Sequence, residues 1–263
     1  MKCDKIDRTE VLNVNEKRKP LIIILILALV MIIPTIVVSV VNSSGNSKQY
    51  SVDKAQTSQN TEITDKEILF LGSSFTNGYK SDGESFVDYL QKVNGVYPLK
   101  LSENKSKMIG DKKDCYIPRL KELSKEHRPH FFLCELSPYD AMGKMKMGEL
   151  ADNYRIDSFD TTTLIGSLEY IVCYAQETWR CPVIFYTCPN VEDEDYEDMI
   201  EALEQVCDKW NLKMLDLYND DDFKTLDDKE MKLYFDEPFC PTKAGYKELI
   251  TPKFEDFIIE FMS

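Results

Sequence analysis

Short apolar runs alternate with longer amphipathic segments over most of the chain. The runs have the length and the apolar content of buried strands, and we expect strands at residues 67–72, 97–101, 130–136, 181–187 and 212–217. The segments between and after them carry apolar residues at helical spacing, which predicts helices over residues 85–93, 115–123, 161–179, 195–210, 242–249 and 254–261. This alternation predicts an α/β domain with a parallel sheet that is covered on both faces.

Residues 21–41 form an uncharged apolar segment that is interrupted only by Pro34, Thr35 and Ser39. A helix needs about 20 such residues to cross about 30 Å of hydrocarbon. A cleaved signal peptide is the alternative interpretation, but its apolar core is usually about 7–15 residues long. We therefore expect one uncleaved transmembrane helix.

The residues that flank this segment predict its orientation. Lys17, Arg18 and Lys19 precede it, whereas uncharged polar residues follow it. The positive-inside rule then makes residues 1–20 a cytoplasmic leader and puts the rest of the chain outside the cell. We expect a single-pass protein of the cell membrane, in which a polar, flexible linker at 42–65 joins the span to an extracellular domain at 66–263.

The charge of the chain beyond the leader argues against one class of partner. Residues 21–263 carry 26 basic and 42 acidic residues, so their net charge is near −16. A field of this sign opposes binding to nucleic acid. We expect no nucleic-acid partner.

The cysteines do not follow a metal-binding pattern. No C-x-x-C pair is present, and no histidine stands at metal-ligand spacing to any of them. We expect no metal and no cofactor, and mostly buried thiols with at most one or two disulfides. The acidic run at 192–198 opens a predicted helix, so we interpret it as a solvated helix start rather than a calcium site.

The first predicted strand leads directly into the sequence Gly-Ser-Ser-Phe-Thr-Asn-Gly at 72–78. In a parallel α/β sheet, ligands bind beyond the carboxyl ends of the strands. A serine in a glycine-flanked turn at that edge is well placed to act as a nucleophile, although Gly-Ser-Ser is also ordinary turn chemistry.

A second motif, Pro-Thr-Lys-Ala-Gly-Tyr at 241–246, lies near the other end of the chain. Together with Phe-Leu-Gly-Ser-Ser-Phe-Thr at 70–76, it resembles the SGNH/GDSL hydrolase family, particularly its membrane-anchored bacterial members. The resemblance extends from about residue 66 to the end. It implies a flavodoxin-like, three-layer α/β/α fold with a five-stranded parallel sheet, and the hydrolysis of acyl esters on small molecules, glycans or lipids.

The resemblance also assigns the site, and several assigned positions depart from the family's pattern. Ser74 is the nucleophile, and its backbone N–H is an oxyanion donor. Glu237 stands where the family has the catalytic Asp, and Cys240 stands where it has the catalytic His. A thiol has an ordinary pKa near 8.5 and cannot shuttle protons as an imidazole does. Tyr139 stands at the position of the oxyanion Asn.

Two further assignments concern the oxyanion glycine and the base. The family's second block has a further oxyanion donor, a glycine; by spacing from Tyr116 we expect Lys105 at its place, and Gly110 is the only glycine nearby. The chain's two histidines, His127 and His130, precede the third predicted strand, so we expect them at its amino end, remote from Ser74.

Three hypotheses follow from this pattern. The chain is a degenerate or low-activity serine esterase that acts on or binds acylated glycan or lipid. Alternatively, it is an active, Ser74-dependent ester hydrolase with an unconventional site. The third hypothesis is a thiol-dependent function through Cys240.

Overall fold

The computed structural model describes residues 45–58 and 62–263. The leader predicted at 1–20 and the membrane span predicted at 21–41 lie outside this part of the chain. Within the described residues, no helix is both long enough and apolar enough to cross a membrane.

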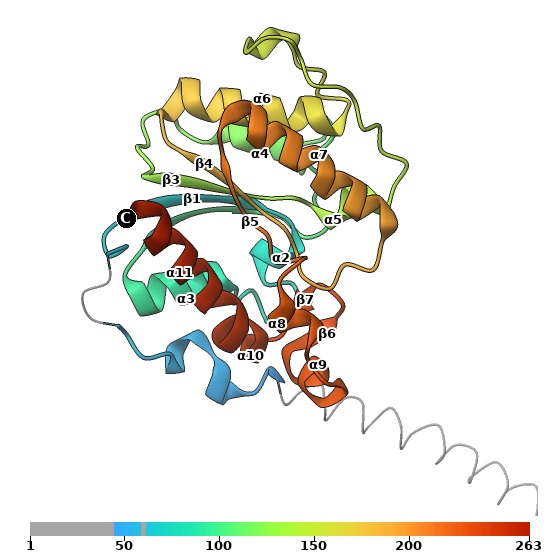
Figure 1. Ribbon diagram of the computed structural model, residues 1–263. Helices are drawn as coiled ribbons and strands as arrows, with labels where there is room; N and C mark the ends of the chain where they lie inside the picture. The colour runs from blue at the N-terminus through green and yellow to red at the C-terminus, as the bar shows by residue number, and fades with distance from the viewer. Residues whose placement is uncertain (1–44, 59–61) are drawn as a thin grey trace, which may run out of the picture. The chain divides into compact units, whose positions relative to one another are not determined.

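The predicted strands form one sheet at the centre of the described chain (Figure 1). Its order is β2-β1-β3-β4-β5 and every pair is parallel, as in a flavodoxin-like sheet. The bounds are β1 Glu67–Gly72, β2 Tyr97–Ser102, β3 Phe131–Glu135, β4 Val183–Tyr186 and β5 Lys213–Leu215. The central strands β1, β3 and β4 are almost entirely buried, which explains why they appear in the sequence as continuous apolar runs.

Helices cover both faces of the sheet, which confirms the predicted three-layer fold (Figure 1). On one face lie α4 Tyr116–Glu122, α6 Leu164–Trp179 and α7 Glu194–Trp210, and on the other lie α3 Phe86–Asn94 and α11 Thr251–Met262. The rings of Phe86 and Phe254 stack 3.8 Å apart and join α3 to α11. The acidic run at 192–198 opens α7, where the Asp193 carboxylate caps the helix by accepting the Asp195 N–H.

The C-terminal helical region differs from its prediction. The sequence predicts separate helices over 242–249 and 254–261, but helical structure continues from α10 Lys243–Gly245 through the π-helix η4 Tyr246–Ile250 into α11. Pro252 lies in the first turn of α11 and lacks an N–H group. The wider π-turn before it, where the Thr251 hydroxyl donates to the Tyr246 carbonyl at 2.7 Å, lets the helix continue through the proline.

Several short elements were not predicted. They are η1 Lys48–Tyr50, η2 Val52–Lys54, α2 Ser74–Asn77, α5 Pro138–Ala141, η3 Ile156–Ser158, α8 Asp221–Lys224, α9 Asp228–Tyr234, β6 Phe235–Glu237 and β7 Cys240–Pro241. Strands β6 and β7 pair antiparallel, and β7 contacts α2. The hairpin therefore brings the C-terminal motif to the turn that carries Ser74.

The predicted flexible linker at 42–65 is wrong for its described part. Asn46 donates to the Lys80 carbonyl at 2.8 Å and accepts the Lys243 N–H at 2.9 Å, so it joins two distant segments. Ala55 and Ile63 are buried in the core. Hydrogen bonds from polar side chains, rather than a long apolar run, hold this segment on the domain. Its sequence is therefore as polar as that of a flexible tether, which explains the wrong prediction.

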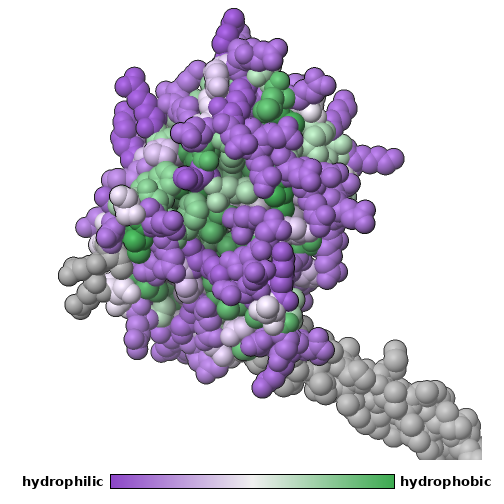
Figure 2. Space-filling view, viewed as in Figure 1, coloured by the Kyte–Doolittle hydropathy of each residue, from purple (hydrophilic) through white to green (hydrophobic). Residues whose placement is uncertain are grey.

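The surface of the domain is largely hydrophilic on the face in Figure 2. Apolar side chains gather there in a band between the two helical layers, where β5 forms one edge of the sheet. Strand β5 has only three residues and begins with the exposed Lys213. A short edge strand with a charged residue offers little surface for pairing with another chain.

Candidate active site

The turn that carries Ser74 follows β1 without a loop. Ser74 is the first residue of α2, and only 1% of its surface is exposed. The preceding Gly72 is required by close packing, because a Cβ there would overlap Thr76 and lie 2.5 Å from Glu135 Oε2. The glycine thus lets the turn approach the end of the neighbouring strand β3.

Two donors, one from the loop of Lys105 and one from helix α5, meet on the Ser74 hydroxyl oxygen. The Lys105 backbone N–H and the Tyr139 hydroxyl each donate to Ser74 Oγ at 2.9 Å. Burial raises the pKa of Tyr139 above its ordinary value, so its phenol is neutral and can donate. The structure therefore brings together Ser74, Lys105 and Tyr139, which the resemblance had assigned to the oxyanion positions. Their catalytic role stays a prediction.

The backbone conformation of Lys105 is one that glycine adopts more easily than lysine, which agrees with the glycine at this place in the family's pattern. Its φ is 61°, in the left-handed region that side chains disfavour. The buried carboxylate of Asp140, next to Tyr139, accepts the Met108 N–H at 2.7 Å and the Ile109 N–H at 3.3 Å. These bonds tie the loop of Lys105 to the helix of Tyr139.

Glu135 is a site residue that the sequence analysis missed. It ends β3, is fully buried, and accepts the backbone N–H groups of Ser73 at 2.8 Å and Thr76 at 3.1 Å. The hydroxyls of Ser73 and Thr76 also donate to it. Burial raises the pKa of Glu135, and the hydrogen bonds oppose this shift. The signal in the sequence was an acidic residue at the end of an otherwise apolar strand.

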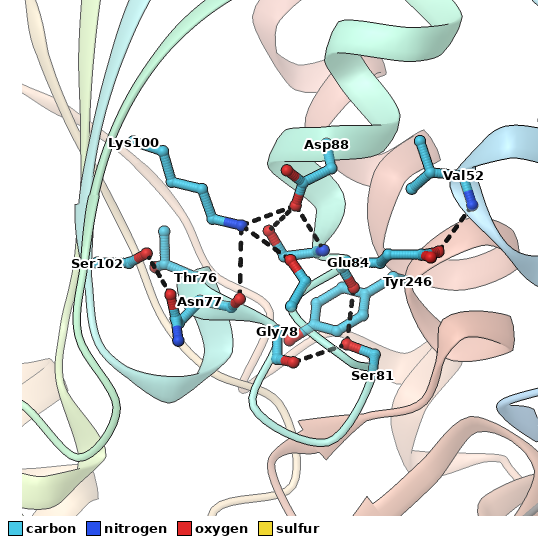
Figure 3. A network of polar contacts seen from close by, with 12 residues as sticks. Val52, Thr76, Asn77, Gly78, Ser81, Glu84, Asp88, Lys100, Ser102 and Tyr246 are labelled. Carbon is cyan, nitrogen blue, oxygen red and sulfur yellow. Dashed lines mark hydrogen bonds and ion pairs between the residues drawn. The ribbon is translucent and has the colours of Figure 1, made fainter.

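The loop after α2 is also fixed by polar contacts (Figure 3). Lys100 donates to the Asp88 carboxylate at 2.7 Å and to the Gly83 carbonyl at 3.2 Å. Ser102 donates to the Asn77 side chain at 2.9 Å. Side chains of strand β2 and helix α3 therefore hold the segment that follows Ser74 in place.

The positions of the family's base and acid are occupied by groups that cannot accept the serine's proton as an imidazole does. Cys240 is buried, and burial raises the pKa of its thiol to about 12, so it is protonated at neutral pH. Its sulfur lies 4.0 Å from Glu237 Oε2. The Glu237 carboxylate instead pairs with Lys80 at 2.7 Å, and Lys80 also pairs with Asp236 at 3.1 Å.

Both histidines lie at the opposite end of the sheet, as the sequence predicts. His130 Nδ1 accepts the Glu67 N–H at 3.2 Å, and His127 Nδ1 lies 3.6 Å from Glu67 Oε1. Glu67 begins β1, whereas Ser74 follows its end. At about 3.3 Å per residue, that strand separates the histidines from Ser74 by about 20 Å. No imidazole of this chain reaches Ser74.

The thiols of the described chain behave largely as predicted. All seven cysteines from Cys115 onward are buried and free, and none forms a disulfide with another described cysteine. Cys188 and Cys240 are therefore both reduced thiols. Within the described residues, no group of three or more His, Cys, Asp or Glu side chains is arranged to hold a metal ion.

Comparisons with known proteins agree on the fold. No family profile and no curated protein matches the sequence. Three solved structures illustrate the likeness. A possible lipase from Chitinophaga pinensis is 12% identical, with a TM-score of 0.59 over 75% of this chain and 99% of its own. A lipolytic G-D-S-L family member from Veillonella parvula is 15% identical, with a TM-score of 0.51 over 72% of this chain and 96% of its own.

The third structure is a family two carbohydrate esterase from Clostridium thermocellum, in complex with cellohexaose. It is 8% identical, with a TM-score of 0.54 over 78% of this chain and 67% of its own. At such identities the likeness concerns the fold. Residues 66–263 thus have the three-layer α/β fold of the G-D-S-L lipolytic proteins.

Proposed function

We propose that the chain is an SGNH/GDSL-type hydrolase with a degenerate site, which binds acyl esters and hydrolyses them slowly at most. One observation carries the proposal: Ser74 Oγ receives two hydrogen bonds at 2.9 Å, whereas both histidines of the chain lie beside Glu67. Donors that meet beside a serine can polarise an ester carbonyl. Without a base, the serine keeps its proton and attacks slowly.

The substrate class follows from the fold and the donors. The structural neighbours include a possible lipase and a carbohydrate esterase. We therefore propose an acyl ester on a small molecule, a glycan or a lipid as the ligand of the Ser74 site. No cofactor is needed for this chemistry.

An active, Ser74-dependent ester hydrolase is the second candidate. The Lys105 N–H and the Tyr139 hydroxyl favour this candidate, because both donate beside Ser74. A serine hydrolase that has lost a member of its catalytic triad keeps part of its rate enhancement through its oxyanion donors. The thiol-dependent function through Cys240 stays a prediction, and it is the least favoured of the three, since burial raises the pKa of this thiol to about 12 and disfavours the thiolate at neutral pH.

We also propose that the protein is anchored in the cell membrane by residues 21–41, with the N-terminus in the cytoplasm and the domain outside. The uncharged length of this segment and the basic residues before it support the proposal.

The rate of fluorophosphonate labelling of the purified full-length chain tests the proposed site. We expect slow labelling that Ser74→Ala abolishes. Tyr139→Phe, which keeps the ring and removes one donor, should slow it by about 100-fold. Labelling that persists in Ser74→Ala would refute the site, and sustained turnover of p-nitrophenyl acetate that depends on Ser74 would favour the active alternative.

A further inference from the structure

Four exposed lysines lie on the loop of Lys105 and in the segment after the helix of Tyr139, in an otherwise acidic domain. Lys105 and Lys107 lie on the loop that donates to Ser74, and Lys144 and Lys146 lie just after the helix of Tyr139. We call these four residues the lysine rim. Residues 104–110 and 142–148 contain no acidic residue, although Glu103, Asp111 and Glu149 flank them and the chain beyond its leader has a net charge near −16.

The two loops of the lysine rim are in contact. A Cβ at Gly143 would lie 2.6 Å from the Lys107 ammonium nitrogen, so this side chain lies against the second loop. Ser137, which precedes the helix of Tyr139, donates to the Ser106 carbonyl at 2.7 Å. The rim is therefore attached to the same backbone that positions the donors of Ser74.

The ammonium groups of the rim lack the ion pairs that neutralise other lysines near the site. Lys80 pairs with Asp236 and Glu237, whereas no rim lysine forms an ion pair with a carboxylate of the described residues. The Lys105 ammonium lies 5.6 Å from the centre of the Tyr79 ring. Two rim lysines have a partial counter-charge, because Lys107 acts on the buried Asp140 and Lys146 acts on the exposed Asp160.

We propose that the lysine rim recognises a negatively charged group, a carboxylate or a phosphate, on the acyl ester that enters the Ser74 site. At physiological salt the screening length is about 8 Å, so rim ammonium groups that form no ion pair act on a charged ligand at short range. This inference rests on the proposed function. It narrows the ligand from any acyl ester to one with an anionic group near its ester.

Isothermal titration of the full-length chain tests the rim without requiring turnover. The probes are trigalacturonate, inorganic tripolyphosphate and the neutral maltotriose. We expect at least one anion to bind more tightly than maltotriose, and Lys107→Gln/Lys144→Gln to weaken that binding by about fivefold or more. Lys125→Gln/Lys213→Gln, which removes the same charge at the amino end of the sheet, is the matched control and should leave binding unchanged.

The outcomes separate the rim from the proposed function. Preference for trigalacturonate would indicate a carboxylate, and preference for tripolyphosphate would indicate a phosphate. The proposed role of the rim would be overturned if neither anion bound more tightly than maltotriose, or if both double variants weakened anion binding equally. Anion binding that persists in a chain without Ser74-dependent labelling would refute the proposed ester chemistry alone.

Discussion

At the scale of single residues, Lys105 combines a useful donor with an unfavourable backbone. Its φ of 61° costs about 1 kcal/mol or more for a residue with a side chain. We predict that Lys105→Gly raises the free energy of unfolding by about 0.5–1 kcal/mol, because glycine adopts this conformation without strain. Urea denaturation of the variant beside Lys125→Gly, at an exposed site, provides the measurement. Equal effects at both sites would contradict the strain.

Glu135 gives a second prediction at this scale. Glu135→Leu keeps the size but leaves the buried N–H groups of Ser73 and Thr76 without an acceptor, at about 1–3 kcal/mol each. Glu135→Gln should cost less than half as much, because its amide oxygen can accept both N–H groups while the Ser73 hydroxyl rotates to accept from the amide. Urea denaturation compares the two. Equal losses would mean that the negative charge itself is required.

The resemblance assigned Ser74, Tyr139 and Lys105 to the site, and the structure brings the three together, although their catalytic roles stay predictions. The sequence could not reveal Glu135, since a single acidic residue at the end of an apolar run does not show what surrounds it. Only the folded structure brings β3 against the turn of Ser73 and identifies the donors that this carboxylate accepts.

At the scale of elements, Asp140 links the loop of Lys105 to α5, and its titration should affect stability. Burial raises its pKa to about 6 in the folded chain, from an ordinary value of 3.8. The folded state therefore binds the proton more tightly than the unfolded state. The stability that Asp140 contributes is full below about pH 4 and is lost as the pH rises through 6.

We therefore predict that the parent's free energy of unfolding, relative to that of Asp140→Asn, falls by about 2 kcal/mol between pH 4 and 7. The asparagine has no proton to lose and keeps one oxygen as an acceptor. Urea denaturation of both chains at several pH values provides the test. A difference that does not vary with pH would show that Asp140 does not titrate in this range.

The elements that the sequence missed share one physical cause. The strands and long helices have apolar periodicity, because each buries one face in the core. The N-terminal segment at 46–55 and the short helices near the site are instead fixed by polar side chains and backbone groups. Such bonds leave no period in the sequence, and they depend on residues far along the chain.

At the scale of the whole molecule, the alternation of strands and helices was sufficient to predict the three layers, and the strand order then follows the common parallel arrangement. The prediction of a membrane anchor concerns residues outside the described part. We expect the full-length chain to stay with membranes after alkaline carbonate extraction.

The double variant Ile26→Arg/Leu29→Arg should release the chain from the membrane. Each arginine near the centre of a span raises the free energy of membrane insertion by about 2.5–3.5 kcal/mol. Lys2→Gln/Lys5→Gln, in the predicted leader, is a matched control and should remain with the membrane. Extraction of the unmodified chain by carbonate would contradict the anchor.

The central claim is that the Ser74 site retains its donors but lacks a base. Initial rates of p-nitrophenyl acetate hydrolysis by the full-length chain test it most directly, beside Ser74→Ala, Cys240→His and the volume control Cys240→Ala. We predict a parent rate close to that of Ser74→Ala and a rise of at least about tenfold in Cys240→His alone. A parent rate far above that of Ser74→Ala, unchanged by Cys240→His, would contradict the account.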